Sequence, residues 1–187
     1  MSYAELIQVK DYMGINTNTD DVLLMQLLDS ASGIIDASTG RNFSAKTASY
    51  TFDAENIKGK ILLLDSYDLL TVTKLTNGDG DEIASANYVL LPRNTTPKWQ
   101  VKLKSGYDWE FDDEDSVITV AGTWGYSATP PDDIVHACIR LTSFLYRQKD
   151  NSSDTDRPLV TGDGVTIMPS SLPSDVTAML KRYQVRI

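Results

Sequence analysis

The only histidine and the only cysteine of the chain, His136 and Cys138, lie two residues apart. A cysteine thiolate beside a histidine is the nucleophile of many hydrolases, and both side chains bind metals. The surrounding sequence predicts a helix from about Pro131 to Gln148, because apolar residues follow the opening prolines and aspartates at three- and four-residue spacing. Residues two apart on a helix point in nearly opposite directions. We therefore expect Cys138 to be buried and His136 to lie on the other face, so the pair is not a catalytic site.

Carboxylates cluster at two places in the middle of the chain. The stretch "TNGDGDE" alternates acids as a calcium loop does, but Glu82 stands where that loop requires glycine and Tyr88 where it requires glutamate. We interpret it as a hairpin turn. A metal-dependent hydrolase is an alternative whose cation would need the acidic run Asp112, Asp113, Glu114 and Asp115. A solvated loop explains that run better, so the sequence predicts no enzyme, no metal and no cofactor.

Aromatic residues support a second alternative. A ligand- or carbohydrate-binding β-module on a helical scaffold would use exposed aromatic rings, and the candidates are Trp99, Tyr107, Trp109 and Trp124. Aromatic side chains on strands belong mostly to the core, which favours packing over ligand binding.

Composition limits the remaining functions. The chain has 187 residues, of which 41% are hydrophobic, enough for one core or a core with an inserted subdomain. A single cysteine excludes an internal disulfide and is typical of synthesis in a reducing cytoplasm. The absence of a signal pattern or long apolar run predicts no secretion and no membrane insertion. The net charge of −9 argues against neutralising DNA phosphates. An acidic protein can still surround a mobile duplex without gripping it.

Hydrophobic periodicity changes along the chain. Period 3.6 predicts two helices before residue 40, period 2 predicts short strands over 48–126, and two further helices follow. The predicted fold is α+β: an antiparallel bundle of about four helices with a β-rich insertion between the second and third. The predicted domains are a helical bundle of residues 1–47 and 127–187, whose tail 149–187 is partly extended, and a β-rich subdomain of residues 48–126.

Several stretches resemble one family. They are "LLDSASGIIDASTGRNF" (27–43), "VLLPRN" (89–94), "ITVAGTWGYSATPPDDIVHACIRLTSFLYRQKD" (118–150) and "LPSDVTAMLKRY" (172–183). Together they resemble the head–tail connector, or adaptor, proteins of tailed bacteriophages, also described as head-completion or DNA-packaging proteins. The resemblance covers nearly the whole chain in the right order, and "GTWGYSATPPDDI" is its most specific part.

The resemblance implies a structural virion protein without catalysis. It implies a homo-oligomeric, dodecameric ring beneath the portal protein, at the head–tail interface, that joins the DNA-filled capsid to the tail. The ring would also contact a tail or stopper protein, and double-stranded DNA would pass through it without sequence-specific binding. The last helix and tail of such adaptors enter the portal, and the matching residues are Leu180, Lys181, Arg182, Tyr183, Arg186 and Ile187. The alternative is that this helix packs only on its own subunit.

Overall fold

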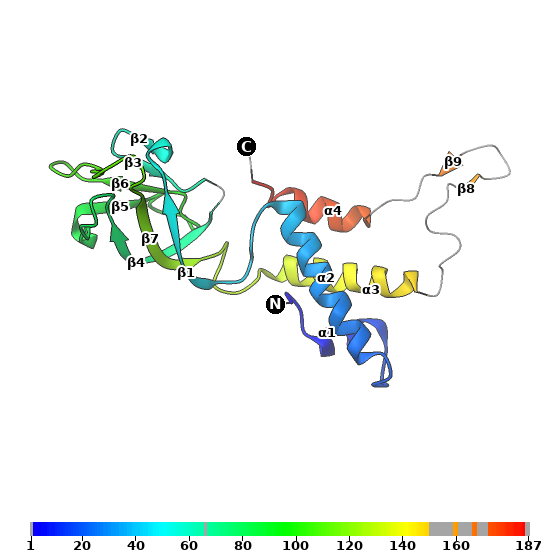
Figure 1. The fold of residues 1–187 in the computed structure, drawn as a ribbon. Helices are drawn as coiled ribbons and strands as arrows, with labels where there is room; N and C mark the ends of the chain where they lie inside the picture. Colours follow the sequence, from blue (N-terminus) through cyan, green and yellow to red (C-terminus); the bar gives the residue numbers. More distant parts are fainter. Residues whose placement is uncertain (1, 66, 150–158, 161–165, 168–171, 186–187) are drawn as a thin grey trace. The chain divides into compact units, whose positions relative to one another are not determined.

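The chain forms two compact units in the computed structural model (Figure 1). One unit consists of Met1–Gly40 and Pro131–Ile187, and the other of Arg41–Pro130. The residues that the structure describes are 2–65, 67–149, 159–160, 166–167 and 172–185.

The first unit, called the helical unit, is built from helices. They are α1 (Leu6–Met13), α2 (Asp21–Thr39), α3 (Asp132–Gln148) and α4 (Ser174–Lys181). Glycines in the left-handed conformation, Gly14 and Gly40, end α1 and α2. A capping box between Glu5 and Gln8 begins α1. Two short strands, β8 (Leu159–Val160) and β9 (Thr166–Ile167), pair between α3 and α4.

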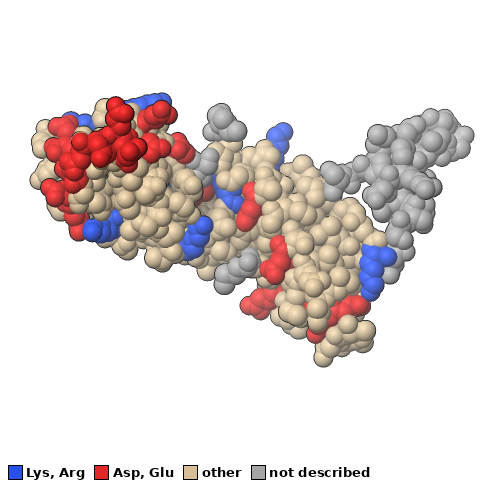
Figure 2. Space-filling model, viewed as in Figure 1, with Lys and Arg blue, Asp and Glu red and all other residues tan. Residues whose placement is uncertain are grey.

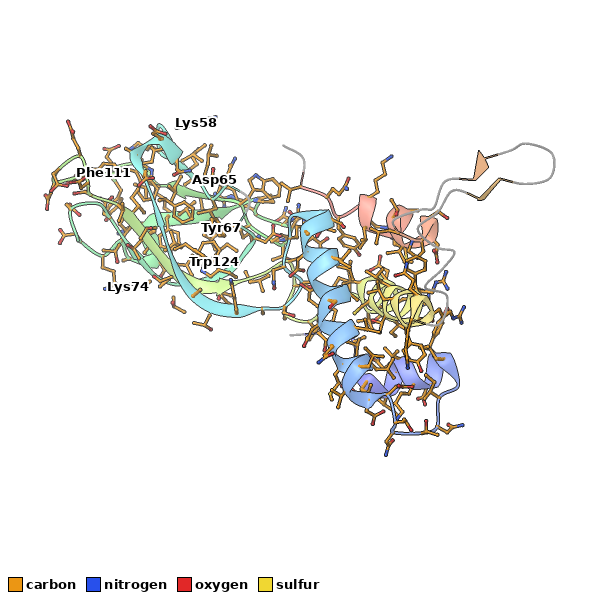
Figure 3. All side chains as sticks on the ribbon, turned by 45° about the vertical axis from the view of Figure 1, so that its right-hand side comes forward. Lys58, Asp65, Tyr67, Lys74, Phe111 and Trp124 are labelled. Atoms are coloured by element: carbon orange, nitrogen blue, oxygen red, sulfur yellow. The ribbon has the colours of Figure 1, made fainter. Side chains whose placement is uncertain are left out.

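The core of the helical unit lies where α2 crosses α3. The inward stripe of α2 is Leu24, Leu28, Ala31 and Ile35, and that of α3 is Ile134, Ala137, Cys138 and Leu141. Ser32 and Cys138 meet at the crossing, where Oγ and Sγ are 3.5 Å apart. The small side chains there let the two helices approach closely. Figures 1 and 3 both show α2 running across α3 rather than alongside it.

The second unit, called the β unit, is built from two antiparallel sheets. The first sheet has the strand order β1 (Lys46–Phe52), β7 (Ile118–Trp124), β4 (Leu69–Thr76). The second has the order β2 (Ile57–Lys58), β3 (Ile61–Leu63), β6 (Gln100–Leu103), β5 (Tyr88–Leu91). Register shifts interrupt the pairing of β4 with β7, and bulges of this kind increase the local twist of a sheet.

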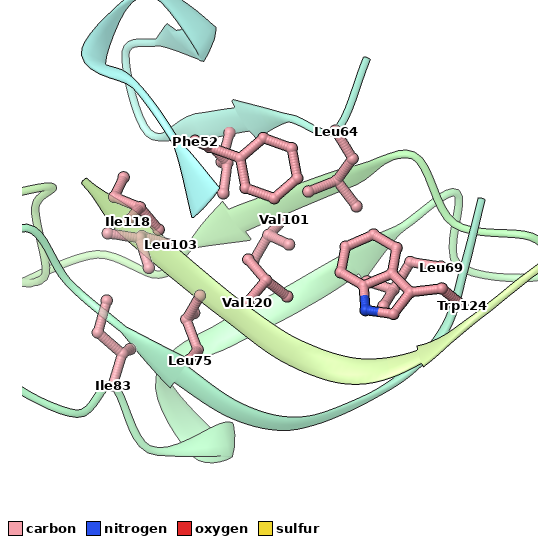
Figure 4. Close-up of a cluster of buried hydrophobic side chains, with 11 residues drawn as sticks. Phe52, Leu64, Leu69, Leu75, Ile83, Val101, Leu103, Ile118, Val120 and Trp124 are labelled. Atoms are coloured by element: carbon pink, nitrogen blue, oxygen red, sulfur yellow. The ribbon is translucent and has the colours of Figure 1, made fainter. Parts of the chain in front are cut away.

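Alternating residues of β7 anchor the core of the β unit. Ile118, Val120 and Trp124 are buried, and they pack with residues of both sheets (Figure 4). The indole N–H of Trp124 donates to the carbonyl of Ala48 at 3.1 Å, so its polar atom is satisfied. Tyr67 lies beside this tryptophan, with ring centroids 6.0 Å apart (Figure 3).

The predicted fold class was wrong. The fold is α+β with four helices and the seven strands β1–β7 in two antiparallel sheets among the described residues, not a helical bundle carrying a β-rich insertion. Two physical reasons account for the error. The alternating apolar residues of the strands enclose a core of their own, and the small residues of α2 favour a crossing with α3 over antiparallel packing.

Two glycines provide a matched stability test. A Cβ on Gly122 of β7 would lie 2.0 Å from the carbonyl oxygen of Thr71, whereas a Cβ on Gly33 of α2 would meet nothing within 4 Å. We expect Gly122→Ala to lower the free energy of unfolding by about 2 kcal/mol because the β4 backbone must move. Gly33→Ala should raise it by about 0.5–1 kcal/mol, since alanine favours the helix. Urea denaturation measures both, and equal stability of the two variants would contradict this account.

Candidate functional site

The C-terminal helix α4 packs on its own helical unit. Val176 and Leu180 are buried, with exposed fractions of 0% and 2%. The hydroxyl of Tyr183 donates to Asp133 at 2.7 Å, and the guanidinium of Arg182 lies 3.3 Å from the other oxygen of that carboxylate. Asp133 therefore holds the end of α4 against the start of α3.

A second polar contact fixes the other end of α4. The guanidinium of Arg140 in α3 lies 2.6 Å from the carboxylate of Asp175 and also donates to the hydroxyl of Tyr12 at 3.1 Å. The hydrogen bond from Arg140 lowers the pKa of Asp175, and the bond to Tyr12 contributes most to raising the pKa of Arg140. Helices α1, α3 and α4 thus share one exposed hydrogen-bonded network.

The residues predicted to dock on a portal fall into three groups. Leu180 is buried and Tyr183 is half-buried, so both hold α4 on its own unit. Lys181 and Arg182 are exposed, and form a cationic end to the helix. Arg186 and Ile187 lie outside the described residues.

Sequence reasoning did not find Asp133. The opening aspartates of α3 predicted only where the helix begins, whereas the carboxylate of Asp133 also accepts a hydrogen bond from Tyr183 and pairs with Arg182. Acidic residues in the first turn of α3 and cations at the end of α4 gave a signal for this pairing. The pairing can be recognised from these charges only when α3 and α4 are known to lie antiparallel.

His136 and Cys138 lie as expected from their spacing. Cys138 is fully buried, and this burial raises the pKa of its thiol. His136 is exposed on the other face of α3, where its ring meets that of Tyr12 edge to face at 6.2 Å. The prediction that Cys138 is buried and that His136 lies on the other face of the helix is confirmed.

The acidic loops of the β unit lie side by side. Figure 2 shows acidic side chains gathered over this unit. The stretch "TNGDGDE" is the tight turn expected, closed by a 2.8 Å hydrogen bond from the amide of Asn77 to the carbonyl of Asp81. The side chain of Asn77 also binds the backbone of Asp108 and Glu110, which belong to the second acidic loop, after β6.

The acidic loops surround a shallow hollow of about 240 Å³. Its acidic lining residues are Asp79, Asp81, Glu82, Asp108 and Glu110. No three histidine, cysteine, aspartate or glutamate side chains of the described residues are arranged to hold a metal ion. The run 112–115 instead forms an exposed turn, in which Asp113 accepts from the hydroxyl of Ser116 at 2.7 Å.

The four aromatic residues of the sugar-binding alternative do not share one surface. Trp124 is buried in the core and Trp109 is partly buried against it. Trp99 and Tyr107 are exposed but flank opposite ends of β6. The helices of the described residues include none long and apolar enough to cross a membrane.

The sequence matches a protein family over nearly its whole length. A profile of the head completion proteins matches residues 5–185. The chain belongs to the head completion protein family. Membership makes it a structural component of the virion at the head–tail interface. No curated protein matches this head completion protein.

Solved structures share the fold of this head completion protein. A chain in the neck of an empty gene transfer agent particle, computed with C6 symmetry, is 18% identical, with a TM-score of 0.68. A chain in the neck of the native particle, computed with C12 symmetry, is 18% identical with a TM-score of 0.65. Each match covers 99% of this chain and 91% of the other. The similarity therefore extends over both the helical unit and the β unit.

The buried thiol of this head completion protein leads to a prediction. Cys138→Ala should lower the free energy of unfolding by about 1–2 kcal/mol, because it removes a small buried side chain, and should leave particle assembly intact. His136→Ala, the exposed control, should cost less. Thermal melting and a plaque or particle-yield assay measure the two effects. Loss of assembly without a lower melting temperature in either variant would contradict the assignment.

Proposed function

We propose that this head completion protein is the subunit of a ring beneath the portal that joins the DNA-filled capsid to the tail. The match to the family profile over residues 5–185 is the observation that carries this proposal. The similar chain in a neck computed with C12 symmetry favours twelve copies, which makes the ring dodecameric. A closed ring of identical subunits requires each copy to present two different, complementary surfaces.

The charge of the chain suits a conduit for DNA. Its net charge of −9 does not neutralise phosphates, so a duplex passing through the ring is not held by counterion release. Like charges also keep the duplex away from the walls and therefore mobile. Double-stranded DNA accordingly passes through the ring without sequence-specific binding.

The cationic end of α4 is the proposed portal contact. Lys181 and Arg182 are exposed there, while buried Leu180 and the Tyr183–Asp133 hydrogen bond keep the helix in place. Charge on a rigid element guides docking onto an acidic partner surface. The tail or stopper protein is the proposed partner on the other side of the ring.

Charge reversal at Lys181 tests the portal contact. Lys181 is exposed and forms no ion pair within the described residues, so Lys181→Glu should lower the melting temperature only slightly, through the charge placed at the C-terminal end of α4. Its affinity for purified portal should fall about tenfold or more, since like charges at an interface cost at least about 1.4 kcal/mol. Mass photometry of chain and portal mixtures at two salt concentrations measures the loss.

Lys102 of β6 supplies the matched control. It is also an exposed lysine, but it lies in the β unit. Lys102→Glu should bind portal with native affinity. Native affinity of Lys181→Glu would rule out the proposed contact, and failure of the unchanged chain to bind portal would rule out the proposed position beneath it.

A further inference from the structure

Two segments connect the β unit to the helical unit. Residues 41–45 lead into β1 and are called the entry segment, and residues 125–130 follow β7 and are called the exit segment. Arg41 begins the entry segment, and its guanidinium Nη1 lies 2.5 Å from the carboxylate Oδ1 of Asp68, just before β4. The two side chains are 20% and 9% exposed. Two opposite charges are thus largely buried at the start of the entry segment.

The ion pair also contacts the exit segment. The backbone carbonyl of Asp68 accepts a hydrogen bond of 2.7 Å from the amide of Gly125. The guanidinium of Arg41 lies over the ring of Tyr126, 5.3 Å from its centroid, where a cation is attracted to the aromatic face. The entry segment, the exit segment and the start of β4 therefore meet at this one pair.

The two segments touch each other through their backbones as well. Gly125 has a φ of +141°, and a Cβ at this position would lie 2.8 Å from the carbonyl oxygen of Ser44 and 3.2 Å from the Cα of Ala45. A side chain has no room there, so glycine lets the exit segment run against the entry segment. The rings of Phe43 and Tyr126 add a second contact, with centroids 5.3 Å apart. Both segments are thus built to lie in one fixed arrangement.

Added stability does not explain the pair. The second carboxylate oxygen of Asp68, Oδ2, is inaccessible to water and accepts no hydrogen bond within the part of the chain that the structure describes. Burial raises the pKa of this carboxyl, although the hydrogen bond from Arg41 acts in the opposite direction. A buried charge with an unsatisfied oxygen costs free energy, and apolar side chains of similar shape would avoid that cost. The free energy of folding alone thus gives no reason for two charges here.

The contacts of the guanidinium are directional, whereas apolar packing is not. A guanidinium is planar: it binds carboxylates in its plane and aromatic rings on its face. Arg41 can satisfy Asp68 and Tyr126 together only in a narrow range of orientations, which fixes the entry segment relative to the exit segment. Fixing a segment in advance lowers the entropy that is lost when a protein binds its partners.

We infer that Arg41 and Asp68 are positioning residues: they fix the direction in which the entry and exit segments leave the β unit, and thereby prepare the subunit for incorporation into the ring. This inference rests on the proposed ring. It assigns to one ion pair a role in assembly that differs from stabilising the single chain.

Hydrogen exchange of the purified whole chain tests the positioning role. Arg41→Met combined with Asp68→Leu replaces both charges by apolar side chains, and should leave the melting temperature unchanged or higher. The amides of Gly125 and Tyr126, which are hydrogen-bonded to backbone carbonyls, should nevertheless exchange about tenfold faster or more, because the exit segment opens locally. Amides in the middle of β7 should exchange as in the unchanged chain.

Incorporation tests the role in assembly. The same double variant should enter particles, or a ring on purified portal, about fivefold less than the unchanged chain or lower, because its segments must then be ordered during assembly. Lys60→Met is the matched control. It removes the cation of an exposed ion pair of the same unit, in which Lys60 lies 3.1 Å from Asp108 and the side chains are 40% and 70% exposed. Exchange at Gly125 and Tyr126 and incorporation should both stay native in this control.

Three results would overturn the inference. The first is native exchange at both amides in the double variant. The second is faster exchange at these amides with native incorporation, which would remove the role in assembly. The third is a lower melting temperature with uniformly faster exchange across the β unit, which would mean that the pair only stabilises that unit.

Arg41→Lys decides the case in which the double variant does not fold. Lysine keeps the charge beside Asp68 but lacks the planar group that lies over Tyr126. Exchange at Gly125 should therefore become faster while the melting temperature changes little, and native exchange there overturns the inference. If the unchanged chain enters no ring, the proposed function fails and the role in assembly with it, whereas the exchange pattern still shows whether the pair positions the two segments.

Discussion

The antiparallel pairing of β1 with β7 is the contact on which the rest of the structure depends. Lys46 at the start of β1 lies opposite Trp124 at the end of β7, so the segment entering the β unit and the segment leaving it run side by side. Helices α2 and α3 are far apart in sequence, and their connecting segments start from these two neighbouring ends. The helical core, with Ser32 against Cys138, can form because both segments emerge at one place.

Further contacts hold these two ends of the β unit together. The amide of Tyr126 donates to the carbonyl of Asn42 at 2.7 Å, and that of Gly125 donates to the carbonyl of Asp68. The side chain of Asp68 pairs with Arg41, and burial raises the pKa of this carboxyl despite the arginine. The pair is weak evidence for added stability, because the cost of removing two charges from water offsets their attraction.

Local sequence patterns predicted individual helices and turns better than they predicted how the helices pack against one another. The exposed and buried faces of α3, with His136 and Cys138 on opposite sides, follow from helical periodicity alone, as does the turn at 76–82. The crossing of α2 over α3 depends on which small residues meet, Ala31 and Ser32 rather than Gly33, and periodicity does not rank them. The role of Asp133 needed the antiparallel placement of α3 and α4, which no local pattern contains.

Assembly into a symmetric ring accounts for exposed features that the stability of a single chain does not explain. The cationic end of α4 and the acidic loops of the β unit are exposed in one copy. A ring between a capsid and a tail needs a contact with its neighbour, one with each partner, and walls that do not bind DNA. The cationic end of α4 is the proposed portal contact, and an acidic surface does not neutralise DNA phosphates, which is why we relate both features to assembly rather than to catalysis.

Cryo-electron microscopy of intact particles, reconstructed at the head–tail junction without imposed symmetry, tests the central claim most directly. Our account predicts a ring of this chain between portal and tail, with twelve copies and DNA passing through the centre. Density for the chain elsewhere in the particle, or as isolated copies without mutual contact, would contradict it.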